Sequence, residues 1–136
     1  MPKRVLLVDD SGMMRALVKR IVMSDPDFVV VGEAENGWIA IDKVKTTKPD
    51  VVLLDIEMPK MNGLDAMKRV RLLSSAKVVI LSSVAQMGSA VALEARRAGA
   101  FAVIAKPSGA VSLNIKEARG TEIIRTLRQA CDLPIE

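Results

Sequence analysis

The chain has no histidine and no tyrosine, a single cysteine, and three aromatic residues in all. Without histidine and with Cys131 alone, a zinc site of the His/Cys kind and an internal disulfide are both excluded. A lone cysteine also suits a reducing compartment. The aromatic residues are Phe28, Trp38 and Phe101. The core must therefore be built from aliphatic residues and methionine.

The charged residues form no block of one sign. Lys and Arg number 20 and Asp and Glu number 16, so the net charge is +4, with the basic residues scattered over several segments. A nucleic-acid interface would gather them on one face, so no nucleic-acid partner is expected. The start of the chain lacks the apolar stretch of a signal peptide, and the uncharged run 78–93 is too short and too polar to span a bilayer. We therefore expect a cytoplasmic protein without a membrane segment.

Four apolar runs stand out, because each is followed by a polar residue of a type that phosphate chemistry uses. The runs 5–8, 51–54, 78–81 and 101–105 lead into Asp9-Asp10, Asp55, Ser82 and Lys106 respectively. Continuous apolar runs, unlike alternating ones, are typical of strands in a parallel sheet that helices cover on both faces.

The pattern alternates five strands with five helices. Strands are predicted near 3–9, 28–33, 50–55, 77–82 and 101–105, and helices near 12–24, 37–46, 64–73 and 88–98. The last helix begins either after Ser112 or only at Thr121, because Gly120 interrupts its pattern. Five right-handed βα units predict a flavodoxin-like three-layer α/β sandwich, a (βα)5 fold whose parallel five-stranded sheet has the order 2-1-3-4-5. One domain is expected over 1–131, with 132–136 as a C-terminal tail or the start of an interdomain linker.

In that strand order the first and third strands are neighbours, so Asp9, Asp10 and Asp55 are expected to meet at the carboxyl edge of the sheet. Oxygen ligands without histidine or cysteine favour a hard cation, Mg²⁺ or Mn²⁺. A carboxylate can itself be a nucleophile and form an aspartyl phosphate. Asp55 is the predicted nucleophile, Asp9 and Asp10 form a metal platform, and Lys106 and Ser82 would contact phosphoryl oxygens.

Simpler interpretations compete with several of these assignments. Asp10 could be only the cap of the first helix, and Ser83 competes with Ser82 for the hydroxyl role. Arg15 and Lys19 are interpreted as a solvated face of the first helix. A phosphatase with an aspartyl nucleophile is a different function on a similar sheet, but it would need a D-x-D pair after the first strand, which the sequence does not provide.

With these motifs, the segment from Lys3 to Pro107 together with the final helix resembles the receiver domain of two-component response regulators. The resemblance implies that Asp55 accepts phosphate from a histidine kinase or a small phosphodonor. It also implies that Mg²⁺ is held by Asp9, Asp10, Asp55 and the backbone carbonyl of Glu57. Lys106 would contact the phosphoryl group, and its peptide bond to Pro107 would be cis.

The segments 55–65, 82–83 and 106–109 are also similar to the receiver part of the chemotaxis protein-glutamate methylesterase family. In that family the receiver represses a C-terminal esterase domain until it is phosphorylated. The chain has neither a G-x-S-x-G motif nor a histidine, so it is not itself the esterase. The expected partners are a histidine kinase and a methylesterase domain or another output protein. A stand-alone receiver acting by protein contact, and a receiver-like module that is never phosphorylated, are the alternatives.

One position departs from the receiver pattern. Receivers usually carry Tyr or Phe three residues before the lysine, and Val103 occupies that place here. A switch in which an aromatic ring swings inward with the Ser82 hydroxyl therefore lacks its ring. Phe101, two residues earlier on the same face of the strand, is the aromatic residue that could substitute in part.

Overall fold

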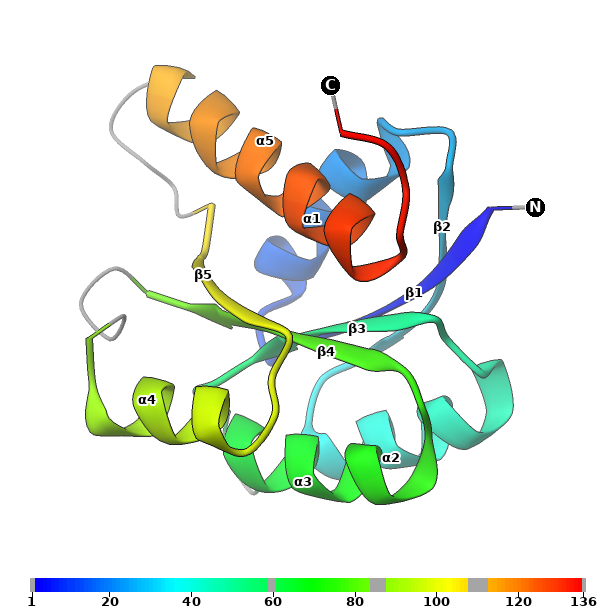
Figure 1. Ribbon diagram of the computed structural model, residues 1–136, viewed down its shortest axis with the longest axis vertical. Helices are drawn as coiled ribbons and strands as arrows, with labels where there is room; N and C mark the ends of the chain where they lie inside the picture. The colour runs from blue at the N-terminus through cyan, green and yellow to red at the C-terminus, as the bar shows by residue number, and fades with distance from the viewer. Residues whose placement is uncertain (1, 59–60, 84–87, 108–112, 136) are drawn as a thin grey trace.

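Strands and helices alternate along the whole chain in the computed structural model, which describes residues 2–58, 61–83, 88–107 and 113–135, the side chains of 113–119 excepted (Figure 1). The strands are β1 (Lys3–Val8), β2 (Phe28–Ala34), β3 (Val51–Asp55), β4 (Lys77–Ser82) and β5 (Ala102–Ala105). The helices are α1 (Gly12–Met23), α2 (Gly37–Thr47), α3 (Gly63–Leu73), α4 (Ala90–Arg97) and α5 (Leu113–Ala130). Every predicted boundary lies within two residues of these, taking the earlier of the two starts considered for the last helix.

The five strands form one parallel sheet in the order β2-β1-β3-β4-β5, which confirms the predicted topology. Val5 of β1 lies opposite Val51 of β3, and the two strands stay paired to Val8 and Leu54. This register brings the residues that follow β1 and the last residue of β3 to the same edge of the sheet.

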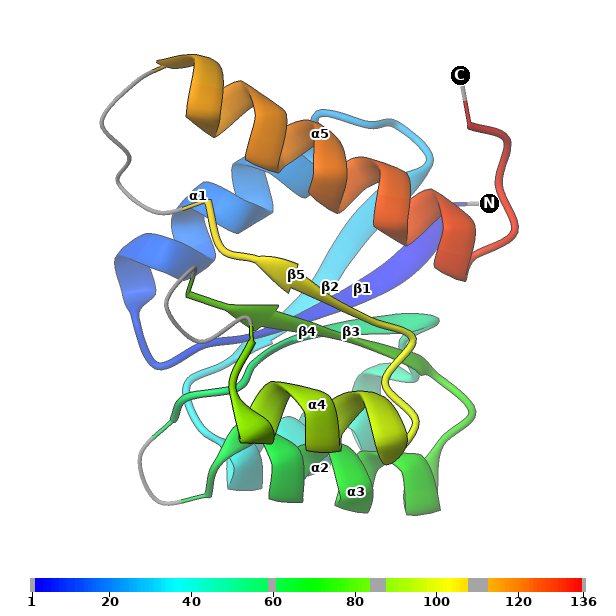
Figure 2. The same ribbon diagram turned by 60° about the vertical axis from the view of Figure 1, so that its left-hand side comes forward.

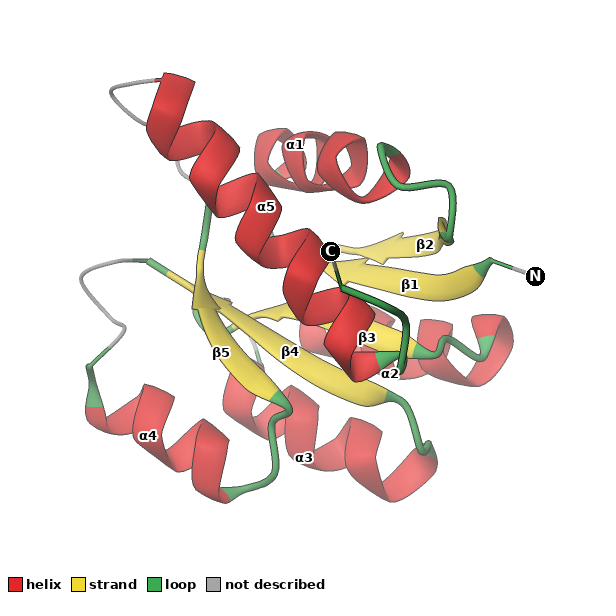
Figure 3. Ribbon diagram, turned by 45° about the horizontal axis from the view of Figure 1, so that its top comes forward, coloured by secondary structure: helices red, strands yellow, loops and turns green. Residues whose placement is uncertain are grey.

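Helices cover both faces of the sheet, with α1 and α5 on one side and α2, α3 and α4 on the other (Figures 2 and 3). Alternate residues of each strand enter two separate apolar clusters, so that Leu6 and Leu54 pack under α2 and α3 while Val5 and Leu53 pack under α1 and α5. Both clusters are aliphatic and contain Phe28 as their sole aromatic side chain among the described residues. The continuous apolar runs are therefore explained by burial on both faces.

Four helices begin at a side chain that accepts a hydrogen bond from a backbone N–H of the first turn. These N-caps are Ser11, Asn36, Asn62 and Ser89. Such caps satisfy N–H groups that have no partner within the helix. Because Ser11 caps α1, the alternative that Asp10 is merely the cap of this helix is wrong, and Asp10 stays available for another role.

The final helix starts at Leu113 and continues through Gly120, so the earlier of the two predicted starts, after Ser112, is the one present. Packing explains the continuity, because Ile123 and Leu127 are fully buried against β-sheet residues of the α1/α5 face. Tertiary packing of this kind outweighs the helix propensity cost of one glycine, about 1 kcal/mol. No helix in the described ranges has the length and hydropathy needed to cross a bilayer.

The start of α3 lies directly against the end of β3. A Cβ atom placed on Gly63 would be 2.5 Å from Ile56 Cα and would also overlap the carbonyl oxygen of Asp55. Because these are backbone atoms, no side chain could move aside to make room. The glycine therefore permits the close approach that fixes Asp55 relative to α3.

We expect Gly63→Ala to destabilise the protein by roughly 1–3 kcal/mol, because the backbone of the β3–α3 junction must shift. Gly12→Ala is the matched control, since a Cβ there would meet only Arg15 Nη2 at an ordinary 3.6 Å. Urea unfolding of both variants measures the difference. Equal stability of the two variants would contradict the close approach.

Candidate functional site

Three carboxylates meet at the carboxyl edge of the sheet. Asp9 and Asp10 follow β1, and Asp55 is the last residue of β3. One oxygen from each lies within 4.8 Å of the other two. Asp9 and Asp55 are buried, with 4% and 1% of their surface exposed, whereas Asp10 is exposed. The predicted convergence of the three acids is present in the structure.

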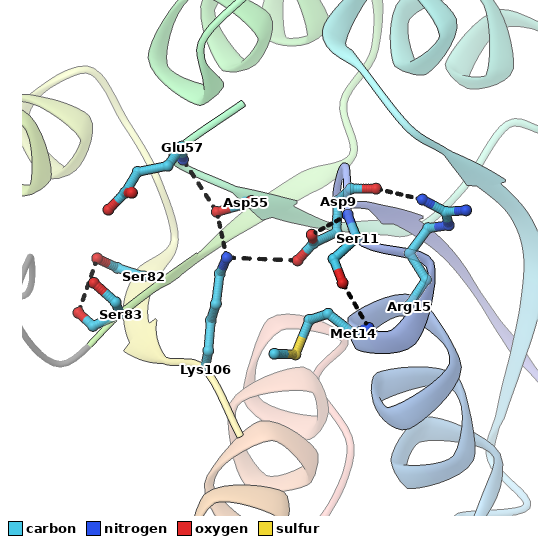
Figure 4. A network of polar contacts seen from close by, with 9 residues as sticks. All are labelled: Asp9, Ser11, Met14, Arg15, Asp55, Glu57, Ser82, Ser83 and Lys106. Carbon is cyan, nitrogen blue, oxygen red and sulfur yellow. Dashed lines mark hydrogen bonds and ion pairs between the residues drawn. The ribbon is translucent and has the colours of Figure 1, made fainter. Parts of the chain in front are cut away.

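Lys106 reaches this cluster from the end of β5 (Figure 4). Its Nζ lies 2.9 Å from Asp55 Oδ1 and 3.6 Å from Asp9 Oδ2. The backbone N–H of Lys106 donates to the Ser82 carbonyl at 2.8 Å, which fixes the strand exit beside β4. One ammonium group thus contacts two of the three carboxylates.

Backbone N–H groups orient the two buried carboxylates. Ser11 N–H donates to Asp9 Oδ1 at 2.9 Å, and Glu57 N–H donates to Asp55 Oδ1 at 3.0 Å. The second oxygen of each acid, Asp9 Oδ2 and Asp55 Oδ2, is buried and accepts no hydrogen bond from the described residues. Buried polar atoms normally have partners, so these two oxygens are the unusual feature of the cluster.

The donor set fits a hard divalent cation. Three carboxylates supply oxygen ligands only, the kind that Mg²⁺ and Mn²⁺ prefer. Asp9 Oδ2 accepts no hydrogen bond from the described residues and lies 3.6 Å from Lys106 Nζ, so it is an atom that a cation would satisfy. The exposed Asp10 leaves one side of the cluster open to solvent, so a cation could keep the waters that Mg²⁺ retains.

The electrostatics of the cluster also favour a bound cation. Burial raises the pKa of Asp55 to about 6, against the opposing effect of the hydrogen bond from Lys106. Burial likewise raises the pKa of Asp9, although the Ser11 N–H and the Lys106 charge oppose it. For Lys106, burial lowers the pKa, but Asp55 and Asp9 outweigh this effect and the pKa is raised. The lysine stays charged, yet its charge does not cancel the effect of burial, which raises the pKa of both Asp9 and Asp55.

A pH dependence of stability follows. The folded state binds a proton at Asp55 near pH 6, whereas the unfolded chain binds it only near the ordinary value of 3.8. Stability of the metal-free protein is therefore expected to rise as the pH falls from about 7.5 to about 5, by roughly 1–3 kcal/mol. Urea unfolding in chelator-containing buffer measures it. The rise should be smaller in Asp55→Asn, where Asp9 remains with a raised pKa, and an equal rise in both proteins would contradict the assignment to Asp55.

The serine predicted to contact a phosphoryl group lies at the end of β4. Ser82 is fully buried, and its hydroxyl donates to the Ser83 carbonyl at 3.2 Å. The described residues show no hydrogen bond between this hydroxyl and the side chain of Asp55 or Lys106, although the Ser82 carbonyl accepts the Lys106 N–H. Ser83 is partly exposed and follows the strand.

Val103 of β5, Phe101 before it and the Lys106–Pro107 bond after it can be compared with the expectations from the sequence. Val103 is buried in the apolar cluster under α2, α3 and α4, while Phe101 precedes the strand and is 40% exposed. The peptide bond between Lys106 and Pro107 is trans, so the cis bond implied by the receiver resemblance is wrong for this structure. The trans form is the lower-energy state of an X–Pro bond by about 0.5–1 kcal/mol, and the cis form needs compensating contacts.

The interpretation of Arg15 as part of a solvated face is also wrong. Its Nη1 donates to the Asp9 backbone carbonyl at 2.6 Å, and its Nε pairs with Glu33 Oε1 at 3.1 Å. Lys19 is half-exposed and lies 3.6 Å from the same glutamate. Arg15 thus ties α1 and β2 to the backbone of Asp9. Its position five residues after Asp10, one turn into the following helix, is the signal that sequence reasoning overlooked.

Comparison with known proteins agrees with this geometry. Residues 5–116 match the family model described as response regulator receiver domain. The protein-glutamate methylesterase/protein-glutamine glutaminase of Pyrococcus abyssi is 43% identical over 131 residues, which are 96% of this chain and 35% of that protein. Its counterpart from Thermotoga maritima is 42% identical over 130 residues, 96% of this chain and 38% of that protein. The chain thus spans little more than a third of the length of these relatives.

Solved structures extend the comparison. The response regulator domain of Thermotoga maritima CheB superposes with a TM-score of 0.86 at 40% identity, covering 99% of this chain and 100% of that one. A second match is the complex of the CheA3 P1 domain with CheY6 from R. sphaeroides, with a TM-score of 0.80 and 42% identity over 96% of this chain and 98% of the matched one. The chain corresponds to the receiver portion of the methylesterases and not to their esterase portion.

Proposed function

Because the chain belongs to the family of response regulator receiver domains, we propose that Asp55 accepts a phosphoryl group from a histidine kinase or a small phosphodonor. The observation that carries the proposal is the state of the Asp55 carboxylate. One of its oxygens is held by Lys106 and the Glu57 N–H, while the other is buried without a hydrogen-bond partner beside Asp9 and Asp10. A nucleophile positioned by one oxygen and free at the other suits an in-line displacement.

In the reaction, Asp55 Oδ2 forms a bond to phosphorus as the bond from phosphorus to the leaving group breaks, giving an aspartyl phosphate. Asp9, Asp10, Asp55 and the Glu57 carbonyl would hold Mg²⁺, which when bound neutralises charge on phosphoryl oxygens. Lys106, already 2.9 Å from Asp55 Oδ1, would neutralise a further oxygen. Phosphoryl transfer needs little more than such positioning and charge compensation.

Phosphorylation then acts as a switch. The new phosphoryl oxygens would draw the Ser82 hydroxyl away from the Ser83 carbonyl, which it contacts at 3.2 Å in this structure. The surface formed by α4, β5 and α5 would shift with it, and so would the loop after β4, whose residues 84–87 lie outside the described part of the chain. A ligand shifts such an equilibrium only through differential contacts in the two states, and Ser82 and Lys106 would supply them. With Val103 on β5, this shift would proceed without an aromatic ring at that position.

The similar proteins indicate what the phosphorylated receiver would control. They are named as protein-glutamate methylesterases and are more than twice as long as this chain. We therefore assign the receiver to a chemotaxis signalling role in the cytoplasm, with a histidine kinase upstream and a methylesterase domain as the controlled partner. The solved complex of the CheA3 P1 domain with CheY6, a protein similar to this chain, supports the upstream assignment. Residues 132–136 would then form the tail or the beginning of a linker.

Incubation with Mg²⁺ and acetyl phosphate, followed by intact-mass measurement, tests the proposal. One added phosphoryl group is expected with Mg²⁺ and none in the presence of excess chelator. An unchanged mass with both acetyl phosphate and a phosphorylated kinase domain would contradict phosphorylation and leave the non-phosphorylated binding module. Steady release of phosphate from a phosphoester substrate would indicate the phosphatase instead.

A further inference from the structure

A shallow groove of about 470 Å³ lies between α2 and α3. These two helices belong to the layer on one face of the sheet (Figure 1). The walls of the groove are one stripe of each helix, formed by residues three and four positions apart. The residues that matter here are Trp38, Ile41 and Lys45 on α2 and Arg69, Leu72 and Leu73 on α3. None of them belongs to the carboxylate cluster.

The groove exposes large apolar side chains. Trp38 is 55% exposed, Leu72 87% and Leu73 50%. Trp38 is the single tryptophan of the chain, and the Arg69 guanidinium lies 5.0 Å from the centre of its ring. Tryptophan and arginine are the residues that contribute most often to binding energy in protein interfaces, usually inside a rim of less important contacts.

The charge of the groove is mainly positive. Lys45 and Arg69 line it from opposite helices, exposed Lys68 adjoins Arg69, and Asp42 is the acidic residue among its walls. Within the part of the chain that the structure describes, these three basic side chains form no ion pair. Their charges are thus free to pair with carboxylates brought by a partner.

We propose that the groove between α2 and α3 binds an acidic amphipathic helix of another protein. Two parallel ridges with apolar side chains between them suit a helix that presents one apolar stripe. Leu72, Leu73 and Trp38 would be covered by that stripe, and Lys45, Lys68 and Arg69 would pair with flanking Glu or Asp residues. The proposal does not depend on phosphorylation of Asp55.

Other occupants fit less well. In a two-fold dimer through this face, the same surface patch meets itself, so its net positive charge would face an equal positive charge. An anionic membrane would satisfy the basic residues, but the apolar side chains line a concave surface, and Asp42 would be brought against the lipid head groups. A protein helix with carboxylates at its margins meets neither objection.

The probe is a synthetic helical peptide of about 18 residues, with leucine on one stripe, glutamate on both flanks and no aromatic residue. Because Trp38 is the sole tryptophan, its fluorescence reports occupancy of the groove directly. We expect saturable binding with a dissociation constant on the order of 10–100 µM, and amide shifts in α2 and α3 by nuclear magnetic resonance. The same peptide with lysine in place of glutamate should bind at least about tenfold more weakly.

Variants separate the groove from general charge effects. The double variant Lys45→Glu/Arg69→Glu should weaken binding at least about tenfold, whereas Arg97→Glu, an exposed arginine on α4, should leave it unchanged. Asp55→Asn should bind as the wild type does. Equal affinity for the lysine peptide, or amide shifts confined to α1, α4 or α5, would overturn the proposal. Binding to phosphatidylserine vesicles without peptide binding, or a dimer that Trp38→Ala dissociates, would overturn it in favour of a membrane or a second copy.

Discussion

Asp55→Asn is expected to reduce uptake of a phosphoryl group to background, a loss of about three orders of magnitude or more. The amide has almost the shape of the carboxylate but offers no nucleophilic oxygen with a negative charge. Intact-mass measurement after incubation with Mg²⁺ and acetyl phosphate checks this directly. Full phosphorylation of the variant would show that another residue is the acceptor.

The same substitution should stabilise the metal-free protein. Asp55 is buried, and burial raises its pKa to about 6, so the ionised carboxylate is less stable in the folded protein than in the unfolded chain. Replacement by a neutral isostere should therefore increase the free energy of unfolding near pH 7.5 by roughly 1–3 kcal/mol. Asp65→Asn, an exposed position in the first turn of α3, is the matched control and should change neither phosphorylation nor stability appreciably. Loss of activity together with loss of stability would point to misfolding.

The second large effect is expected for Asp10→Asn, which should weaken Mg²⁺ binding by about 100-fold or more. Removing residues that only support metal ligands already costs about 10- to 100-fold, and Asp10 is proposed as a ligand itself. At a fixed Mg²⁺ concentration near the wild-type dissociation constant, the rate of phosphorylation should fall in proportion to the fraction of protein that holds Mg²⁺. Titration of Mg²⁺ followed by amide shifts near Asp55 and Lys106 measures the affinity.

Asp10 is well suited to this test because its side chain is exposed, so its replacement should leave the fold intact. Asp132→Asn removes the same charge from an exposed turn after α5, where the backbone φ of 57° also suits asparagine. This control should bind Mg²⁺ as the wild type does. An Asp10→Asn variant with unchanged affinity would restrict the metal site to Asp9 and Asp55.

Much of the fold could be predicted because two local rules combine in this sequence. Unbroken apolar runs such as 51–54 indicated strands buried on both faces, and the βα alternation limited the topology to a few arrangements. Once β1 and β3 are neighbours, the meeting of Asp9 and Asp55 follows from the parallel direction of the strands. The carboxylate cluster could therefore be predicted from the sequence alone.

Other features depend on contacts that no periodicity encodes. The sequence favours a solvated helix face for Arg15, but its long side chain reaches back to the Asp9 carbonyl and across to Glu33. The helix through Gly120 persists because Ile123 and Leu127 are buried, an effect of tertiary packing on a weak local signal. The trans bond before Pro107 is the intrinsically preferred state of an X–Pro bond, and only the family resemblance implied the cis form.

The unequal exposure of the three acids has a kinetic consequence. Asp9 and Asp55 are enclosed by the sheet edge, yet Asp10 faces bulk water, so an ion can reach the cluster without any opening of the fold. The rate of ion exchange would then be governed by how quickly Mg²⁺ sheds part of its hydration shell, a slow process for this small cation. Mn²⁺, which holds its water shell less tightly, should bind faster at the same site. The rate of activation would then depend on the ion that binds and not on a conformational opening of the protein.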